Sequence, residues 1–149
     1  MRFGFTGYST RKSFNQAEGF AEWELPWRWQ WQWGSRWQLQ SKLDLSAGWL
    51  GASDREAVVA SSGPSLVLGN ERLPLSLDFG FSPTLLSRDE FGGTDLGSIL
   101  QFTTHGGLNW DINSRFRLGY RFQHMSNGSL NRNHNPGFNM HVFAVSYLF

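Results

Sequence analysis

The sequence predicts an all-β fold: a single domain, residues 1–149, forming an eight-stranded antiparallel up-and-down transmembrane β-barrel. Apolar and polar residues alternate with a period of two along the whole chain, and no segment has the period of a helix. Short turns alternate with longer polar loops, as in up-and-down barrels. Despite 8 Trp and 13 Phe, no run approaches the roughly 18–20 consecutive apolar residues that a membrane-spanning helix requires.

The first half of the chain contains four expected strands, over residues 2–8, 21–33, 36–50 and 57–68. The second strand is the most one-sided, because charged and amide side chains occupy one face and large apolar side chains the other. Its apolar face consists of Trp23, Leu25, Trp27, Trp29, Trp31 and Trp33. Gly34-Ser35 forms the turn into the third strand. In the fourth strand, Gly63-Pro64 interrupts the alternation and indicates a bend, a bulge or an edge.

The second half contains four more expected strands, over residues 73–82, 98–112, 115–126 and 138–149. Two long polar loops are expected, at 83–97 and 128–137. The last strand ends on Phe149 with Tyr147 two residues earlier on the same face. This ending resembles the terminal signature of outer-membrane barrels, and together with the alternation it favours a membrane barrel.

Alternation alone leaves open which face of the barrel lies outside. A soluble, lipocalin-like barrel would turn the apolar face inward around a ligand. Two observations favour the membrane orientation. The Trp side chains on the apolar faces are too bulky for a narrow interior, and the polar faces mix Gly and Ser with opposite charges that can pair inside a tight lumen. We therefore expect the apolar faces to contact lipid.

Composition excludes several classes of function. The formal net charge is +1, with 13 Lys and Arg against 12 Asp and Glu, so no overall field favours nucleic acid. Cys is absent, which excludes disulfides, thiolate catalysis and cysteine metal sites. The first residues lack the features of a signal peptide. Because the rest of the chain has the pattern of an exported protein, we expect that a leader has been removed and that Met1 is an added start.

A candidate catalytic pair lies at the end of the seventh expected strand. His124 and Ser126 are two residues apart, so they share a face, and this is the apolar face that also carries Phe122 and Tyr120. A base next to a hydroxyl is the arrangement required for nucleophilic catalysis, provided that a third group orients the imidazole. Strand parity puts Asn139 of the last strand on the same face and at the same end, where its amide oxygen can accept a hydrogen bond from the ring.

Groups for an oxyanion hole follow the pair directly. The backbone N–H groups around Asn127 and Gly128, with the side-chain amide of Asn127 or Asn135, could stabilise an oxyanion. The alternative interpretation is that His124 and Ser126 are polar residues at the end of a strand, where a barrel meets water.

Other polar residues give weaker signals. His105, His134 and His141 come from different strands and loops without ligand spacing, so no metal site is expected. His105 has the parity of the lumen and is expected in a polar interior network. Asp89-Glu90 and Asp95 are more typical of a solvated acidic loop than of a cation site.

The segment from His124 to Gly128, followed by Asn135-Pro136-Gly137-Phe138-Asn139 and an aromatic-ended strand, resembles the lipid A 3-O-deacylase (PagL) family of outer-membrane barrel enzymes. Looser similarity extends to the Trp-rich second strand and to residues 65–68 and 93–98. The resemblance implies a serine esterase of the Gram-negative outer membrane. It would remove the 3-O-linked acyl chain, a 3-hydroxy fatty acid, from lipid A with a triad on the barrel's outer surface.

The resemblance also implies roles for individual residues. Ser126 would be the nucleophile, His124 the general base and Asn139 the orienting member, while Asn127 and Asn135 would assist the oxyanion or the loop. Asn139 departs from the better-known Glu pattern, and the loop before it is one residue longer. An Asn here can hold the ring but carries no negative charge.

The expected partners are lipid A or lipopolysaccharide as substrate and the surrounding membrane lipid, with no cofactor and no nucleic acid. The sequence leaves open whether the barrel forms a homodimer. The alternative from a different class is a non-catalytic outer-membrane barrel with a structural or adhesive role, in which His124 and Ser126 are only interfacial residues.

Overall fold

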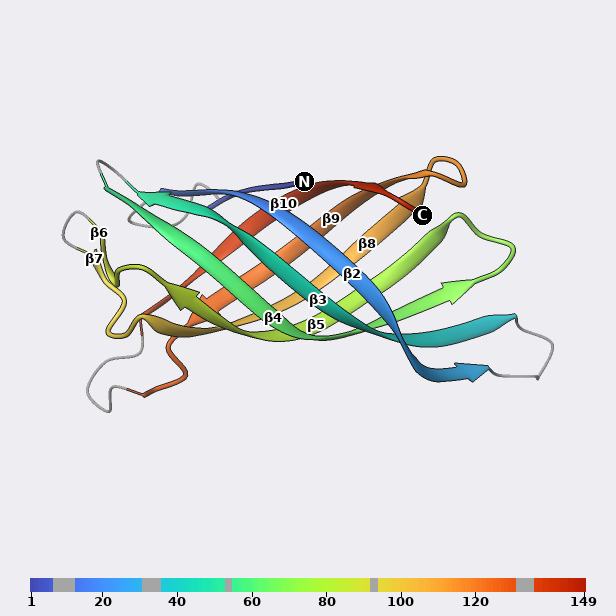
Figure 1. Cartoon of the computed structure of the whole chain (residues 1–149), viewed down its shortest axis with the longest axis horizontal. Coiled ribbons are helices and arrows are strands. Elements are labelled where there is room, and N and C mark those ends of the chain that lie inside the picture. Colours follow the sequence, from blue (N-terminus) through green and yellow to red (C-terminus); the bar gives the residue numbers. More distant parts are fainter. Residues whose placement is uncertain (7–12, 31–35, 53–54, 92–93, 131–135) are drawn as a thin grey trace.

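The computed structural model describes residues 1–6, 13–30, 36–52, 55–91, 94–130 and 136–149. Eight strands close into one barrel in the order β1-β10-β9-β8-β5-β4-β3-β2, and all neighbours pair antiparallel (Figure 1). This confirms the predicted fold class. A search of the described residues finds no helix long and apolar enough to cross a membrane.

The barrel strands are β1 (Arg2–Phe5), β2 (Phe14–Gln30), β3 (Trp37–Ala52), β4 (Arg55–Asn70), β5 (Leu75–Leu86), β8 (Leu100–Asp111), β9 (Phe116–Ser126) and β10 (Gly137–Tyr147). A separate two-stranded sheet consists of β6 (Glu90–Phe91) and β7 (Thr94–Asp95). We call the end of the barrel at which β9 stops the Ser126 end, and the end at which β9 begins the Phe116 end. In Figure 1 the Ser126 end is on the left, beside β6 and β7.

In the first half, β1 and β2 differ most from their expected limits. β2 begins at Phe14 rather than at 21, because residues 14–18 already alternate between buried and more exposed positions and pair with β1. β1 ends at Phe5, and the remainder of its expected range lies partly outside the described residues. The expected turn at Gly34-Ser35, and Trp31 and Trp33, also lie outside them.

The expected interruption at Gly63-Pro64 is neither an edge nor a break in β4, which runs continuously from Arg55 to Asn70. Only its pairing with β5 is interrupted, between Ser61 and Ser65, and it resumes in the same register. Pro64 cannot donate to a ladder, so a local loss of pairing is the physical consequence.

The expected polar loop at 83–97 is wrong at its beginning. β5 continues to Leu86, because Thr84 and Leu86 point into the barrel and are buried. The Thr84 hydroxyl is hydrogen-bonded to the Thr103 hydroxyl of β8 at 2.8 Å. The later part of that range contains two short strands, β6 and β7.

A bulge in β2 between Glu24 and Arg28 leaves backbone carbonyls outside the regular ladder. Side chains of β3 satisfy two of them: Gln40 Nε2 donates to Leu25 O at 2.7 Å, and Ser41 Oγ donates to Trp27 O at 2.8 Å. These contacts keep the end of the strand attached to its neighbour.

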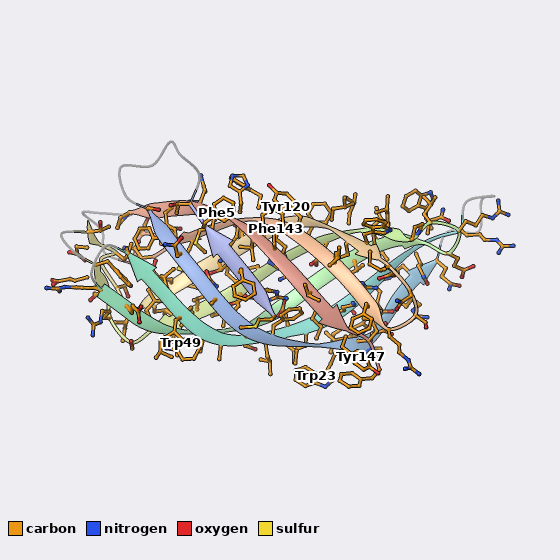
Figure 2. All side chains as sticks on the ribbon, turned by 90° about the horizontal axis from the view of Figure 1, so that it is seen from above. Phe5, Trp23, Trp49, Tyr120, Phe143 and Tyr147 are labelled. Atoms are coloured by element: carbon orange, nitrogen blue, oxygen red, sulfur yellow. The ribbon has the colours of Figure 1, made fainter. Side chains whose placement is uncertain are left out.

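The outer wall of the barrel is apolar, and this confirms the predicted orientation of the two faces. Figure 2 shows Phe5, Trp23, Trp49, Tyr120, Phe143 and Tyr147 projecting outward from the ribbon. Other large apolar side chains exposed on the wall include Phe3, Trp27, Trp29, Trp37, Leu66, Leu77, Phe79, Phe81, Leu85, Leu108, Trp110, Phe116, Leu118, Phe122 and Val145. The lipocalin-like alternative, with the apolar face inward, is therefore wrong.

Ion pairs between strands fill the middle of the lumen. Arg121 of β9 contacts Asp44, Glu22 and Asp78 at 2.9, 3.0 and 2.7 Å, respectively. Arg2 of β1 contacts the same Asp44 and Glu22 at 2.7 and 3.0 Å. Two guanidinium groups and three carboxylates thus connect five strands across the interior, as the opposite charges on the polar faces predicted.

The lumen at the Ser126 end is apolar rather than polar, which the sequence interpretation did not anticipate. Phe14 stacks on Phe138 with centroids 4.1 Å apart and meets Phe91 edge-on at 5.5 Å. Buried aliphatic and Met side chains surround them, namely Leu50, Ala52, Ala57, Val59, Leu86, Leu96, Met125, Met140 and Val142. A packed hydrophobic cluster therefore lies inside the barrel at this end, with Phe91 and Leu96 contributed by the segment between β5 and β8.

We predict that Arg121→Met lowers the free energy of unfolding by about 3–5 kcal/mol, because it leaves buried carboxylates without their partner. Urea unfolding in detergent micelles, followed by Trp fluorescence, measures this change. The matched control is Arg115→Met, since Arg115 is exposed and has no ion pair with a described residue. The control should stay within about 0.5 kcal/mol of the wild type. Equal stability of the two variants would contradict a structural role for the ion pairs.

Candidate active site

The three residues predicted to act together do meet on the outer wall at the Ser126 end. His124 and Ser126 project from β9, and the register pairs His124 with Asn139 of β10 and Ser126 with Gly137. His124 Nδ1 donates a hydrogen bond to Asn139 Oδ1 at 2.7 Å. His124 and Asn139 are exposed, and Ser126 is half-buried. Because Nδ1 carries the proton in this contact, a neutral His124 presents the lone pair of Nε2 as its base.

Gly137 provides the space in which the imidazole and the serine meet. A Cβ atom at this position would lie 2.9 Å from His124 Cε1, 3.0 Å from Ser126 Cβ and 3.1 Å from Met125 O. The ring edge and the serine side chain therefore converge over the glycine. Among the interactions of the described residues, no hydrogen bond joins Ser126 Oγ to the imidazole. Such bonds are often formed only once substrate is bound.

The inner faces of β9 and β10 fix the position of these residues. Met125, between His124 and Ser126, is 1% exposed, and Met140 beside Asn139 is equally buried. Phe138, on the other side of Asn139, stacks on Phe14 inside the barrel. Each outward residue of the candidate site thus has at least one inward neighbour in the apolar cluster, so these side chains stand on a rigid wall.

Asn127 turns inward after Ser126 and is fully buried. Its Nδ2 donates to Leu96 O at 3.1 Å, and its Oδ1 accepts from the Ser129 backbone N at 2.9 Å. The side chain therefore ties the loop that follows β9 to the segment that precedes β8. Of the two roles predicted for Asn127, these contacts favour support of the loop over donation to an oxyanion from its side chain.

The backbone reverses at Gly128 and Ser129, which have φ values of 61° and 65°. Gly128 is also close to Phe102 of β8, since a Cβ atom here would lie 2.7 Å from the ring. Only glycine fits both requirements. Asn127 accepts hydrogen bonds from two N–H groups of this turn, because Ser129 N donates to its Oδ1 and Leu130 N donates to its backbone O. Asn135, the other predicted amide, lies outside the described residues.

His105 and His141, the other histidines that the structure describes, are not part of this site. His105 is buried in the lumen with Nε2 3.5 Å from Asp78 Oδ1, which confirms its predicted place in the interior polar network. His141 lies on the outer wall, where its Nδ1 is 2.8 Å from the Tyr120 hydroxyl. His134 lies outside the described residues, and the described part of the chain contains no group of three or more His, Cys, Asp or Glu that could hold a metal ion.

Sequence reasoning found the three side chains but assigned no role to Gly137. The position of Gly137 could have been predicted from the sequence, because pairing His124 with Asn139 in an antiparallel ladder puts Gly137 opposite Ser126. The contact between Gly128 and Phe102 had no comparable signal, since it depends on how closely the turn folds back over β8.

The barrel is closed and antiparallel, and its apolar outer wall carries a serine, a histidine and an amide that orients the imidazole. These features define a class of barrel proteins whose candidate active site faces outward rather than into the lumen. The family model described as Lipid A 3-O-deacylase (PagL) matches residues 15–148, and the chain therefore belongs to this family. The family resemblance inferred from the His124 to Gly128 motif is thereby confirmed.

A curated relative agrees with this membership. Lipid A deacylase PagL of Bordetella bronchiseptica is 30% identical over 73 residues, which are 49% of this chain and 40% of the relative. The match thus spans less than half the length of that curated relative. The crystal structure of the outer membrane enzyme PagL superimposes with a TM-score of 0.73 at 18% identity, covering 98% of this chain and 95% of that chain, and shows the same fold.

We predict that Gly137→Ala slows the reaction of Ser126 with a fluorophosphonate reagent by about 10- to 100-fold, because the new methyl group displaces the imidazole and misaligns the pair. Intact-protein mass spectrometry measures the labelling rate. Gly69→Ala is the matched control, since a Cβ atom there would be 3.6 Å from the Ser76 side chain, an ordinary contact. Equal labelling of both variants would argue against convergence over Gly137.

Proposed function

We propose that this protein is a serine esterase of the outer membrane that removes the 3-O-linked acyl chain from lipid A. The observation that carries the proposal is the Ser126, His124 and Asn139 arrangement on the apolar outer wall, with the imidazole oriented by a 2.7 Å hydrogen bond. Membership of the Lipid A 3-O-deacylase family supplies the substrate and the bond that is cleaved.

The exterior of the barrel supports a location in the membrane. The strands that cross the wall are 11–17 residues long apart from β1, which is enough for the about 9–11 residues that a tilted transmembrane strand needs. Exposed Trp side chains gather toward the Phe116 end, as interfacial aromatic girdles do, namely Trp27, Trp29, Trp37 and Trp110. In this orientation the candidate site lies near the opposite interface, beside the ester groups of the lipid.

In the first chemical step, Ser126 Oγ attacks the carbonyl carbon of the ester while His124 Nε2 takes the hydroxyl proton. Asn139 Oδ1 holds Nδ1–H and so keeps the ring in the tautomer that has a basic Nε2. Backbone N–H groups of the turn at residues 127–128 stabilise the tetrahedral oxyanion. The protonated His124 then gives its proton to the departing sugar oxygen, and the acyl group stays on Ser126.

In the second step, water attacks the acyl-Ser126 carbonyl, and His124 again takes and returns the proton. The fatty acid leaves and the free serine is regenerated. His124 carries out the proton transfers of both steps, and the backbone donors stabilise the charge that develops. The scheme therefore uses groups of this chain and water.

Asn139 should support this chemistry less well than a carboxylate would. An amide oxygen orients the ring, but it adds no negative charge to stabilise the imidazolium that forms in the transition state. In serine proteases, changing the Asp of the triad to Asn costs about 10⁴ in turnover, because the histidine is then held in the wrong tautomer. Here the oxygen of Asn139 faces Nδ1, so the tautomer is correct and the expected deficit is the smaller electrostatic part.

We predict that Ser126→Ala and His124→Ala each lower fatty-acid release from purified lipopolysaccharide by at least about 10³-fold. The fatty acid is quantified by mass spectrometry. Both side chains are on the outer wall and outside the lumen network, so heat-modifiable migration of the folded barrel on gels should not change. Undiminished release by Ser126→Ala would overturn the esterase mechanism.

We predict that Asn139→Glu retains or increases the turnover number, because a carboxylate would both orient His124 and stabilise its protonated form. Asn139→Leu, which removes the acceptor and keeps a similar size, should lose activity. Measured kcat values for the two variants test the assignment. If Asn139→Glu were inactive in a folded barrel, another group would have to orient His124.

A further inference from the structure

A groove of about 850 Å³ lies on the outer wall at the Ser126 end, over β1, β2, β3 and β4. It is built on a different set of strands from the candidate active site, which is on β9 and β10. The groove is separate from that site but opens at the same end of the barrel, on the same outward side of the wall.

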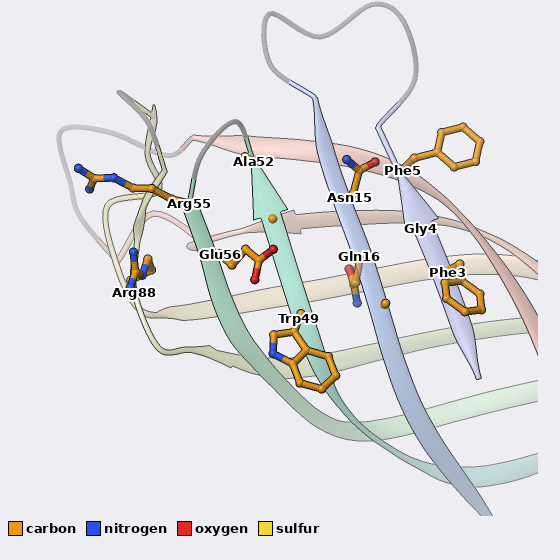
Figure 3. A pocket seen from close by; sticks show the side chains of 12 residues that line it. Phe3, Gly4, Phe5, Asn15, Gln16, Trp49, Ala52, Arg55, Glu56 and Arg88 are labelled. Carbon is orange, nitrogen blue, oxygen red and sulfur yellow. The ribbon is translucent and has the colours of Figure 1, made fainter.

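The groove has an aromatic part and a charged part (Figure 3). Phe3 and Phe5 of β1 form one side, and Trp49 of β3 lies between them and β4. Arg55, the first residue of β4, and Arg88, in the segment that follows β5, line the other side. Trp49 is 61% exposed and Phe3 is 53% exposed, so the aromatic part presents a large apolar surface to its surroundings.

Neither arginine is neutralised by the described part of the protein. Arg55 and Arg88 are exposed, and neither forms a salt bridge with a described residue. At the Phe116 end, Arg28 and Arg36 each pair with a Glu. Arg72 and Arg115 at that end form no ion pair with a described residue, but neither of them lines the groove. Two unpaired guanidinium groups beside an apolar surface match a ligand that is both anionic and lipidic, and planar guanidinium suits phosphate in particular.

Glu56 is the acidic residue of the groove, and its stem passes close to Gly51. Like the arginines, Glu56 forms no ion pair with a described residue. The three side chains therefore leave a net positive charge in the groove. The Glu56 carboxylate should repel an anion bound in the groove. Neutralising Glu56 should therefore strengthen anion binding, whereas neutralising the arginines should weaken it.

Aromatic contacts connect the groove to the candidate active site. Phe5, which lines the groove, pairs in the ladder with His141 of β10, and their ring centroids are 5.9 Å apart. His141 is two residues from Asn139 on the same outward face. A glycolipid that carries several acyl chains on a phosphorylated sugar headgroup can lie across these strands and contact both places.

We propose that the groove is a second binding subsite for the lipid substrate, in which Arg55 and Arg88 bind a phosphate group of lipid A and the aromatic part holds an acyl chain that is not cleaved. This proposal rests on the proposed deacylase function. The subsite positions the headgroup so that the scissile ester reaches Ser126, and it selects phosphorylated lipid A over forms that lack phosphate.

The test compares phosphorylated lipid A with the same lipid A after phosphatase treatment, both in detergent micelles. Replacing Arg55 and Arg88 together by Gln should raise KM for the phosphorylated substrate by about three- to tenfold at unchanged kcat, the effect expected of two exposed charge pairs. KM for the dephosphorylated substrate should not change. Glu56→Gln should lower KM for the phosphorylated substrate.

The matched control replaces Arg72 and Arg115, two exposed arginines at the Phe116 end, by Gln. It changes the net charge equally and should leave both KM values as in the wild type. The groove proposal is overturned if the Arg55 and Arg88 variant behaves like this control, or if KM rises equally for both substrates. It is also overturned if that variant only dissociates a dimer in sedimentation, which would make the groove a contact between copies.

A binding measurement separates failure of this subsite from failure of the proposed function. Ser126→Ala barrels, with and without the two arginine changes, are titrated with both forms of lipid A. The arginine changes should weaken binding of the phosphorylated form alone. If the wild-type barrel releases no fatty acid from the phosphorylated or from the dephosphorylated lipid A, the deacylase function is contradicted. Normal wild-type activity with equal binding by both barrels contradicts the subsite and leaves the function standing.

Discussion

The ion pairs inside the barrel determine which side of β1, β2, β3, β5 and β9 faces outward. Arg121 lies between Asp44 and Asp78 in the lumen, and burying it unpaired would cost several kcal/mol. Because the side-chain period of a strand is two, an inward Arg121 makes Gln123 and Met125 inward as well. The same parity turns His124 and Ser126 outward. The position of the candidate site on the wall is thus a consequence of charge pairing within the lumen.

An outward site differs from the usual enzyme cleft in how it obtains its substrate. His124 is exposed on the wall, and the exposed Phe122 is next to it on the same face. The surrounding bilayer would deliver an amphiphilic substrate along the wall, so contacts spread over several strands have to provide the positioning that a cleft provides elsewhere. Rigidity comes from inside, where Met125, Phe138 and Met140 pack in the apolar cluster.

Much of this structure could be predicted from the sequence because it depends on alternation. Strand number and the contact between His124 and Asn139 follow from a period of two and antiparallel pairing. The choice of the outward face needed two further observations, the bulk of the Trp side chains and the opposite charges on the polar faces. Features set by distant strands could not be predicted. The apolar cluster around Phe14 and Phe91 needs the segment after β5 to enter the barrel, and the groove between Phe3 and Arg55 needs four strands in their final register.

A barrel with this outward site should hydrolyse one particular ester of lipid A. The decisive experiment is tandem mass spectrometry of purified lipid A before and after incubation with the wild-type barrel in detergent, because the fragments identify the position of each acyl chain. We expect loss of a single ester-linked chain, from position 3, with the amide-linked chains retained. Unchanged lipid A, or loss of a chain from another position, would show that the barrel does not have this activity.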